Sequence, residues 1–441
     1  MNDMTRHLPP NHQPNSQPNH YPVIVIGGGQ AGLSASWHLK QRGIAHVVFE
    51  KNRIAYEWRE RRWDSFCLVT PNWQCTLPGF PYQGNDPYGF MLKDEIVAYL
   101  EAFVASFDPP VLEGVGVTKL SRNDNGGYLV STSIGEYSAD EVIIAVGGYH
   151  LPTKPKAAER LPADMLQLHA PQYRNADALP PGAVLVVGTG QSGCQIAEDL
   201  HLAGRKVHLC VGGAPRAPRQ YRGKDAVEWL NQMGYYDIGI HEHPNKERVR
   251  AKANHYLTGR DGGREIDLRK FAREGMALYG RLNDIVGTKL TLKPDLEQNL
   301  DAADLTLESI KDTIDAYIAR NGIDAPVEPR YLPLWKPAAE RTELDFNEAG
   351  ITTVIWCIGY KADFTWVDVP VFDGRGYPGH DRGITTVPGL YFLGLPWQYT
   401  WGSGRFSGVA RDAAHLVERI ASRLYTAPRA TAGLNALALG S

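Results

Sequence analysis

The apolar residues of this chain gather in short runs separated by stretches with helical spacing, which is the pattern of a parallel α/β fold. The run 22–26 is rich in β-branched residues and predicts a buried strand. A glycine-rich segment follows, then a helical pattern over 33–41 that ends before Gly43, and a second strand pattern over 46–50. This β-α-β unit has the length expected for nucleotide binding.

The same order of elements returns in the middle of the chain. A strand pattern over 183–187 leads into a second glycine-rich loop, followed by a helical pattern over 194–202 and a strand pattern over 207–211. The repetition predicts an α/β protein with two Rossmann-like dinucleotide-binding domains.

The rest of the sequence indicates how the two domains are connected. From 222 to about 341 the chain is charged with helical spacing, and its clearest amphipathic helix covers 304–320. Sheet-like sequence resumes at 350–357 and 389–393, before a last helical pattern over about 408–425. We therefore predict that the second domain is inserted into the first.

The predicted domain limits follow from these patterns. The first domain comprises 21–160 and 342–425, and the second comprises 161–341 with a helical insert at about 222–341. Residues 1–20 are rich in Pro, Asn and His and lack the apolar centre of a signal peptide, so we expect a disordered tail. Residues 426–441 form the expected C-terminal tail.

Composition and charge narrow the classes of function. The 441 residues include 46 Lys plus Arg and 49 Asp plus Glu, a formal net charge of −3, which argues against nucleic acid as the main partner. The 43% apolar and 22% charged fractions are those of a soluble globular protein. No apolar run approaches the ~20 residues that span a bilayer. We expect a cytoplasmic protein that acts on a small molecule.

The cysteines exclude two kinds of chemistry. They are odd in number and scattered, at Cys67, Cys75, Cys194, Cys210 and Cys357. The sequence has no C-x-x-C pair and no Cys/His cluster at zinc spacing, so we predict no metal site and no dithiol–disulphide chemistry within one motif. A reduced compartment fits this pattern.

The loop of the first unit is Gly27-x-Gly29-x-x-Gly32. Its first glycine is expected to make a tight turn, its second to let the backbone approach a pyrophosphate, and its third to allow close helix–strand packing. Glu50 ends the second strand, where a carboxylate accepts hydrogen bonds from ribose hydroxyls. This register favours a dinucleotide site over a chance glycine-rich turn. The residues assigned to it are Gly27, Gly29, Gln30, Ala31, Gly32 and Glu50.

The second loop lacks the acid that the first unit carries. No Asp or Glu stands at 208–212, and basic residues flank that point. A missing acid with nearby arginines favours a 2′-phosphate, hence NADPH over NADH, although these arginines could instead belong to a solvated basic loop. The residues assigned to this site are Gly188, Gly190, Gln191, Ser192, Gly193, Arg216 and Arg219.

Two dinucleotide sites in one chain imply an electron relay, in which one nucleotide delivers a hydride and the other receives it. The first site, with its acid, suits a resident FAD. The second suits a visiting NADPH. An amine oxidase would not need the second site.

Further motifs resemble those of two-dinucleotide-binding-domain flavoproteins, and within them the flavin-containing (class B) monooxygenases. The resemblance runs from Tyr21 to about Ala421. Trp58-Arg59 stands at the spacing of the family's G-G-x-W segment, without its glycines, and Val146-Gly147 ends an A-T-G-like strand with Val for Thr. The resemblance also implies FAD contacts from Gly359, in Trp-Cys-Ile-Gly-Tyr, and from Gly394, which ends Gly-Leu-Tyr-Phe-Leu-Gly.

The linker before the second loop partly matches the family fingerprint F-x-G-x-x-x-H-x-x-x-Y-[KR]. His169, Tyr173 and Arg174 stand at the matching positions, whereas Ala163 and Met165 replace the Phe and the first Gly. Relatives of the Baeyer–Villiger type carry Trp-Pro in place of Tyr-Arg. The match favours heteroatom oxygenation, with His169 and Tyr173 as candidate catalytic residues; a linker histidine satisfied by backbone is the alternative.

Asn72 follows Pro71 where flavin-containing monooxygenases place an Asn beside the flavin. The resemblance implies that its amide hydrogen-bonds a C4a-hydroperoxide or holds the nicotinamide carboxamide. The alternative is a turn residue, since Pro-Asn is common in turns. Aromatic residues on two loop segments are expected to flank the flavin, either as a pocket wall or as core: Trp63, Trp73, Tyr82, Trp397, Tyr399 and Trp401.

The resemblance implies an FAD-dependent, NADPH-consuming monooxygenase that forms a C4a-(hydro)peroxyflavin with O₂ and oxygenates a nitrogen or sulfur of a small molecule. A Baeyer–Villiger oxygenase and a flavin NADPH oxidase or reductase without oxygen insertion stay open as alternatives, as does a flavin-bound sensor. Dimers are common in the family, but this sequence leaves the oligomeric state open. The substrate cannot be named from the sequence.

Overall fold

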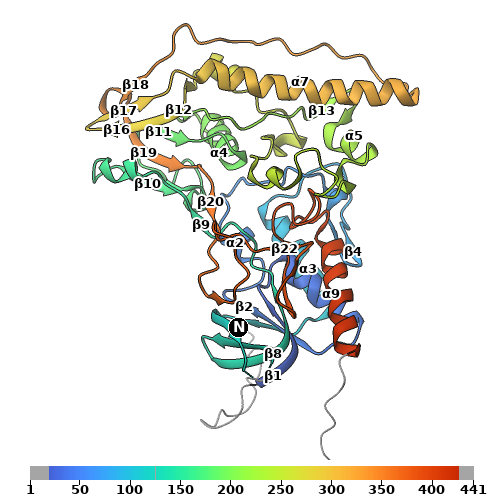
Figure 1. Cartoon of the computed structure of the whole chain (residues 1–441). Coiled ribbons are helices and arrows are strands. Elements are labelled where there is room, and N and C mark those ends of the chain that lie inside the picture. Colours follow the sequence, from blue (N-terminus) through green and yellow to red (C-terminus); the bar gives the residue numbers. More distant parts are fainter. Residues whose placement is uncertain (1–18, 125, 427–441) are drawn as a thin grey trace, which may run out of the picture.

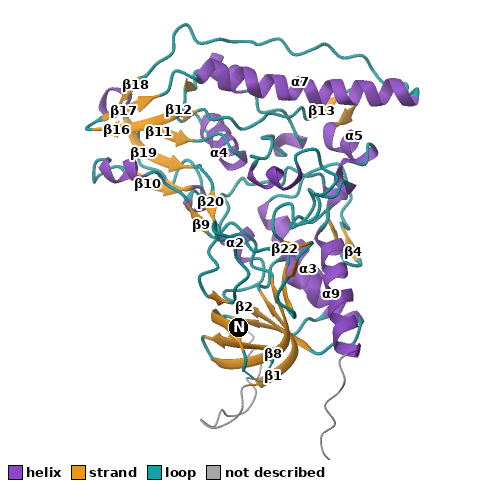
Figure 2. Cartoon of the chain, in the orientation of Figure 1, coloured by secondary structure: helices purple, strands orange, loops and turns teal. Residues whose placement is uncertain are grey.

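The computed structural model describes residues 19–124 and 126–426 and folds them into two lobes (Figure 1). We call the place where the chain crosses from one lobe to the other the waist. Each lobe is built around its own sheet. We call residues 19–148 and 362–426 the first lobe and residues 153–359 the second lobe. Figure 2 shows that loops fill much of the region where the lobes meet.

The first lobe contains a sheet in the order β21-β6-β7-β8-β1-β2-β5. Its centre is parallel, because β1 pairs with both β2 and β8, while β6, β7 and β8 form an antiparallel extension. These strands are β1 (Asn19–Ile26), β2 (His46–Glu50), β5 (Val111–Glu113), β6 (Val117–Arg122), β7 (Tyr128–Thr132), β8 (Gly135–Ile144) and β21 (Val367–Asp368). β24 (Leu390–Phe392) pairs with β8 in parallel, which brings the C-terminal part of the chain back beside the first strands.

Three helices pack against this sheet, namely α1 (Gln30–Gln41), α3 (Lys93–Phe107) and α9 (Val409–Thr426). β-branched residues of β1 form the base of the core, with Val23, Ile24 and Val25 fully buried. α9 presents an apolar face that includes Leu416 and Ile420 to the same core. The C-terminal helix thus completes a lobe that the N-terminal strand begins.

The second lobe contains a five-stranded parallel sheet in the order β10-β19-β11-β12-β15. Its strands are β10 (Leu166–His169), β11 (Ala183–Val187), β12 (Val207–Cys210), β15 (Ala277–Tyr279) and β19 (Ile351–Trp356), and α4 (Gln191–Leu202) follows β11. The long helix α7 (Leu296–Asn321) lies across the top of the lobe (Figure 1). A small antiparallel sheet lies nearby, formed by β16 (Leu282–Val286), β17 (Lys289–Leu292) and β18 (Glu343–Asp345).

The structure corrects the predicted domain boundary at 342. The strand 351–356, expected in the first domain, is β19 and lies between β10 and β11 in the second sheet. The chain therefore returns to the first lobe only after Trp356. The two chain crossings pair with each other at the waist, through β9 (Leu151–Pro152) and β20 (Tyr360–Lys361).

The insert and the tails also differ from the prediction. The amphipathic helix begins at Leu296 rather than at 304, and the stretch 222–341 contributes β15 to the second sheet besides its helices. Asn19 and His20, placed in the N-terminal tail, belong to β1 and pair with β8. Residues 1–18 and 427–441 of the predicted tails lie outside the described residues.

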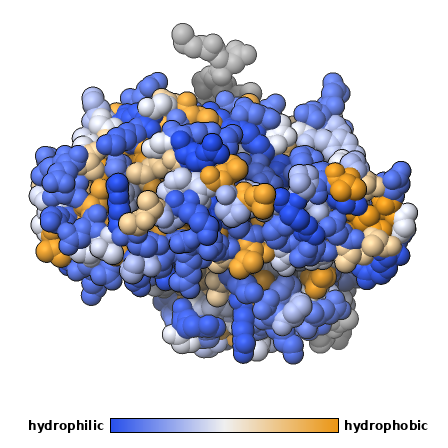
Figure 3. All heavy atoms as spheres, turned by 90° about the horizontal axis from the view of Figure 1, so that it is seen from above, coloured by the Kyte–Doolittle hydropathy of each residue, from blue (hydrophilic) through white to orange (hydrophobic). Residues whose placement is uncertain are grey.

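Smaller elements complete the fold. The short helices are α2 (Tyr56–Glu60), α5 (Ala226–Gln232), α6 (Leu268–Arg273) and α8 (Phe346–Ala349), and the short strands are β3 (Thr76–Leu77), β4 (Phe80–Pro81), β13 (Gln220–Tyr221), β14 (Lys224–Asp225), β22 (His380–Asp381) and β23 (Ile384–Thr385). Seen from above, the molecule is mostly hydrophilic with small separate apolar patches (Figure 3). Within residues 19–124 and 126–426, no helix has the length and apolar character needed to cross a membrane.

Candidate active site

The first glycine loop joins β1 to α1. A side chain would clash at two of its glycines, whereas a third glycine faces open space. A Cβ atom on Gly27, where φ is +108°, would lie 2.7 Å from the carbonyl oxygen of Ala145, and one on Gly32 would lie 1.8 Å from the Gly27 carbonyl oxygen. Both positions therefore require glycine. A Cβ atom on Gly29 would meet no atom within 4 Å. The open space above Gly29, at the start of a helix, fits a pyrophosphate.

Glu50 is held in place beside this loop. Its two carboxylate oxygens accept hydrogen bonds from the backbone N–H groups of Gly28, at 2.7 Å, and Asn52, at 2.8 Å. These contacts fix the carboxylate at the end of β2 and leave further lone pairs on each oxygen. The geometry fits an acceptor for ribose hydroxyls, and so the residues present fit an adenine dinucleotide such as FAD.

The segment that precedes α9 covers the start of α1. The Gln30 side chain donates to the carbonyl of Gly404 at 3.0 Å and lies 3.4 Å from Nε1 of Trp58. Ala31 is also covered, because a Cβ atom on Gly394 would lie 2.8 Å from its Cβ. The N-terminal and C-terminal segments of the first lobe therefore meet at this glycine loop.

The other residues predicted to contact the flavin make different contacts within the protein. The ring of Trp58 stacks on Phe406 at 5.6 Å between centroids, whereas Arg59 forms an ion pair with Glu101 at 2.5 Å. Val146 lies over the turn at Gly27 and precedes Gly147 at the end of the β8 segment. Gly359 stands apart from this group, on the second chain crossing at the waist. Their contact with FAD stays a prediction.

The second glycine loop repeats the geometry of the first. A Cβ atom on Gly188 would lie 2.7 Å from the Cys357 carbonyl oxygen, and one on Gly193 would lie 2.0 Å from that of Gly188. A Cβ atom on Gly190 would meet nothing within 4 Å. The loop between β11 and α4 therefore offers a second space of the same kind, which fits the pyrophosphate of a second dinucleotide.

The second unit has no acidic residue at the end of β12, the position that corresponds to Glu50 of the first unit. Gln191 hydrogen-bonds both backbone groups of Leu257, at 2.5 and 3.3 Å, and Ser192 lies partly buried in the first turn of α4. Burial lowers the pKa of His208 on β12 to about 4, which keeps its imidazole uncharged at neutral pH. After β12, the N–H of Gly212 donates to the Thr189 hydroxyl at 2.9 Å.

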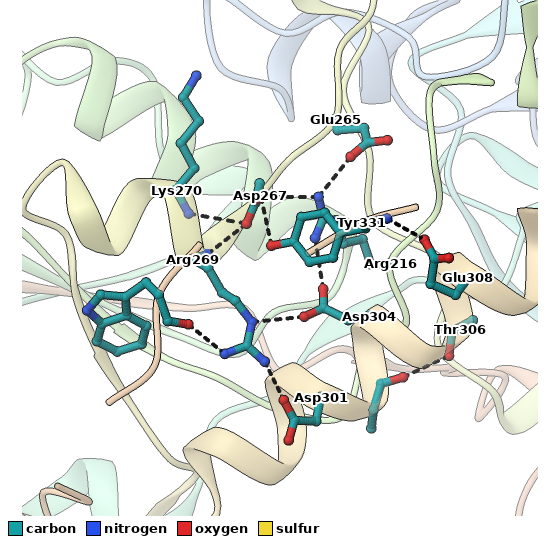
Figure 4. A network of polar contacts seen from close by, with 12 residues as sticks. Arg216, Glu265, Asp267, Arg269, Lys270, Asp301, Asp304, Thr306, Glu308 and Tyr331 are labelled. Carbon is teal, nitrogen blue, oxygen red and sulfur yellow. Dashed lines mark hydrogen bonds and ion pairs between the residues drawn. The ribbon is translucent and has the colours of Figure 1, made fainter. Parts of the chain in front are cut away.

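The structure does not support Arg216 as a phosphate ligand. Its side chain is only 2% exposed, and its guanidinium contacts the carboxylates of Glu265 at 2.8 Å, Asp304 at 2.8 Å and Asp267 at 3.4 Å. Figure 4 shows this group together with Arg269, which pairs with Asp301 and Asp304. The network binds α7 to the segment before α6, and the charge of Arg216 is neutralised within the protein.

Arg219 is likewise unsuited to the predicted role. It is 1% exposed, pairs with Asp225 at 3.0 Å and donates to the carbonyl of Val69 at 2.8 Å. Its guanidinium also lies over the ring of Phe90. Basic residues near a missing acid suggested a phosphate site, but the sequence did not show that both guanidinium groups are buried and paired within the protein. The residues that contact a 2′-phosphate are therefore not assigned.

The side chain of Asn72 holds a neighbouring loop. Its Nδ2 donates to the Asp86 carbonyl at 2.9 Å, and its Oδ1 accepts from the N–H of Met91 at 2.8 Å. The buried amide keeps one N–H and one lone pair for other partners. Its contact with flavin or nicotinamide stays a prediction.

The fingerprint residues lie where the two lobes touch. Tyr173 is fully buried and donates to Asp199 of α4 at 2.6 Å, and Asp199 also accepts from Ser65 at 2.5 Å and from Arg260 at 2.7 Å. We call these four residues the Asp199 junction. Burial and the neighbouring carboxylate raise the pKa of Tyr173, so its phenol stays protonated. The sequence offered no signal that Asp199 is buried.

His169 ends β10, next to this junction. Its backbone N–H donates to the Gln172 side chain at 2.8 Å, and its ring Nδ1 is buried without a hydrogen-bond partner in the described chain. Burial lowers the pKa of its imidazole. A catalytic role for His169 stays a prediction.

A cavity of about 390 Å³ opens beside the Asp199 junction. First-lobe residues line one side and residues of the insert line the other; they include Ser65, Cys67, Asp86, Phe90 and Arg260.

The cysteines of the chain are free thiols, and burial raises the pKa of Cys75, Cys210 and Cys357 to about 12. Such thiols are poor nucleophiles at neutral pH.

Comparisons with known proteins agree with this architecture. Residues 24–272 match the family described as pyridine nucleotide-disulphide oxidoreductase. An uncharacterized CzcO-like oxidoreductase of Geobacillus kaustophilus is 33% identical over 401 residues, which cover 90% of this chain and 97% of that protein. A probable indole-3-pyruvate monooxygenase of Arabidopsis thaliana is 30% identical over 233 residues, which cover 49% of this chain and 52% of that protein.

Among solved structures, a flavin-containing monooxygenase from Stenotrophomonas maltophilia shares the fold. Its TM-score is 0.62 at 20% identity, and the match covers 92% of this chain and 99% of that one. The predicted α/β class with two dinucleotide-binding domains is thereby confirmed, as is the resemblance to flavoproteins that use FAD and NADPH. The chain belongs to the pyridine nucleotide-disulphide oxidoreductase family, as a flavin-dependent oxidoreductase.

Proposed function

We propose that this protein is a cytoplasmic monooxygenase that consumes NADPH and O₂ and oxygenates a nitrogen or sulfur atom of a small molecule. The observation that carries the proposal is the pair of glycine loops, one in each lobe. Each leaves open space above its middle glycine, Gly29 or Gly190, at the start of a helix. Tyr173-Arg174 in the fingerprint supports heteroatom oxygenation over ketone insertion.

The chain's own residues would divide the work between the lobes. The first loop and Glu50 would bind FAD, which accepts a hydride from NADPH and reacts with O₂ when it is bound. The second loop would bind NADPH, and the Asp199 junction would hold the lobes so that the two nucleotides face each other. Trp58 and Phe406 would exclude water from the flavin end of the site.

Similarity to a probable indole-3-pyruvate monooxygenase supports oxygen transfer to a small organic molecule. A flavin oxidase or reductase without oxygen insertion is the second candidate, since the family as a whole is named for disulphide reduction. The cysteines are free thiols, and all but Cys357 are buried, which disfavours a reductase that works through a pair of cysteines.

The two candidates differ in how the reduced enzyme reacts with oxygen. The bound flavin is reduced anaerobically with NADPH and mixed with aerated buffer in a stopped-flow spectrophotometer. A transient near-ultraviolet band that precedes the return of oxidised flavin supports a monooxygenase. The proposal is contradicted if the flavin is reoxidised at once and releases one equivalent of H₂O₂, and if amines, sulfides and ketones leave that yield unchanged. Oxygenation of ketones alone would identify a Baeyer–Villiger enzyme.

A further inference from the structure

Arg405 lies on the segment that covers the first glycine loop. The residue before it, Gly404, accepts the hydrogen bond from Gln30 at the start of α1, at 3.0 Å. The residue after it, Phe406, stacks on Trp58. Arg405 therefore stands at the flavin end of the first lobe, and sequence analysis did not single it out.

The guanidinium of Arg405 contacts only neutral groups. It lies 4.0 Å above the ring of Trp401, donates to the carbonyl of that residue, and donates to the Asn254 side chain at 3.0 Å. No carboxylate of residues 19–124 and 126–426 forms an ion pair with it. The ionisable groups that face it are the phenols of Tyr149, Tyr235 and Tyr236, and burial lowers the pKa of the guanidinium.

Two other arginines of the first lobe, Arg382 and Arg411, have acidic partners. Arg411 pairs with Asp237 at 2.9 Å, and Arg382 lies 3.6 Å from Asp412. The side chain of Arg405 is half-buried, and its neutral partners replace only part of the hydration that it loses. A ligand anion would supply the missing charge.

Aromatic rings surround the same place. Tyr236 lies 4.7 Å from the ring of Trp401 and 5.4 Å from that of Tyr235, between centroids. These tyrosines belong to the insert, which is fastened to the first lobe by a backbone hydrogen bond of 2.6 Å from Ile240 to Tyr399. The insert thereby adds an apolar wall next to the guanidinium.

We propose that Arg405 binds the carboxylate of the substrate, whose apolar or aromatic body lies against Trp401, Tyr235 and Tyr236. The inference rests on the proposed monooxygenase function and narrows its substrates to small organic acids. Arginine suits this task because its planar fork matches a carboxylate. The insert would then determine specificity, through tyrosines that the first lobe does not provide.

The test compares carboxylates with their uncharged amides. Phenylacetate, indole-3-acetate and hexanoate, and the amide of each, are titrated into the oxidised holoenzyme by isothermal titration calorimetry. We expect at least one acid to bind more tightly than its amide, and Arg405→Gln to weaken that acid about tenfold or more while leaving the amide unchanged. Arg375→Gln is the control for the lost charge, because that side chain is 87% exposed. It should change neither the affinity for the acid nor the affinity for the amide.

Other outcomes overturn the inference without touching the proposed function. Equal or undetectable binding of acid and amide by the parent enzyme would do so. So would an Arg405→Gln variant that loses FAD, or that is reduced more slowly by NADPH, while its carboxylate affinity is unchanged, because the guanidinium would then serve a cofactor. Failure of the proposed function is seen separately, as absence of flavin reduction by NADPH in the parent enzyme.

Discussion

At the scale of single residues, the partners of a buried arginine indicate whether it stabilises the fold or binds a ligand. Arg216 is neutralised by Glu265, Asp267 and Asp304, so its removal would leave buried carboxylates without a partner. We expect Arg216→Met to lower the free energy of unfolding by about 3–5 kcal/mol. The folded fraction should keep its Michaelis constant for NADPH.

Chemical denaturation measures the first effect and steady-state kinetics the second. The control is Arg375→Met, whose exposed pair with Asp373 is worth about 0–1 kcal/mol. A raised Michaelis constant for NADPH with unchanged stability would restore the phosphate contact that the sequence suggested.

A buried histidine links stability to pH at the same scale. His208 is 4% exposed, its Nδ1 bonds the hydroxyl of Tyr279 at 2.9 Å, and burial lowers its pKa to about 4. The unfolded chain binds a proton near pH 6.5 and the folded chain does not, so this contribution to stability is lost as pH falls towards 4. Between pH 7 and pH 5 we expect a loss of about 2 kcal/mol from this group.

Urea unfolding of the parent and of His208→Gln at both pH values isolates that contribution. The amide replaces the ring without titrating, so the variant should be less sensitive to acid by the same about 2 kcal/mol. Equal acid sensitivity of the two proteins would show that the ring is not protonated on unfolding.

At the scale of elements, α4 carries one of the contacts that join the lobes. Asp199 receives hydrogen bonds from Ser65 of the first lobe and Tyr173 of the linker. Tyr173→Phe should cost about 1.5–3 kcal/mol, because the carboxylate stays buried with one donor fewer. It should also slow flavin reduction by NADPH, since the lobes are less firmly aligned.

A double-mutant cycle with Ser65→Ala tests whether the junction acts as a unit. Non-additive effects on the reduction rate are expected, because both hydroxyls donate to one carboxylate. A Tyr173→Phe enzyme with unchanged reduction rate but impaired oxygen transfer would instead favour a catalytic phenol.

The same scale shows what the sequence can and cannot predict. Strand and helix patterns located both β-α-β units, because buried parallel strands and amphipathic helices follow local periodicity. The predicted helix start at 304 was wrong, because α7 begins at Leu296, and so was the predicted domain of β19, which lies in the second sheet. An apolar run carries no information about which strand it pairs with. The two carboxylates that hydrogen-bond Arg216, Glu265 and Asp304, lie 49 and 88 residues away along the chain.

At the scale of the whole molecule, the two lobes predict that the two nucleotides bind independently. Gly29 and Gly190 have φ values of −77° and −62°, which any residue adopts, and a Cβ atom on either would meet nothing within 4 Å. Substitution by valine should therefore leave the fold intact and fill only the space that a pyrophosphate requires. Each variant then removes one nucleotide from one lobe.

We expect Gly29→Val to purify without FAD and with unchanged far-ultraviolet circular dichroism, because its lobe is folded but its loop is blocked. Gly190→Val should retain FAD that dithionite reduces and NADPH does not. Gly374→Val is the matched control, since a Cβ atom there also meets nothing within 4 Å and the residue lies in neither glycine loop. Loss of FAD from Gly190→Val, or rapid reduction of that variant by NADPH, would show that the second loop is not the NADPH site and that one lobe serves both nucleotides.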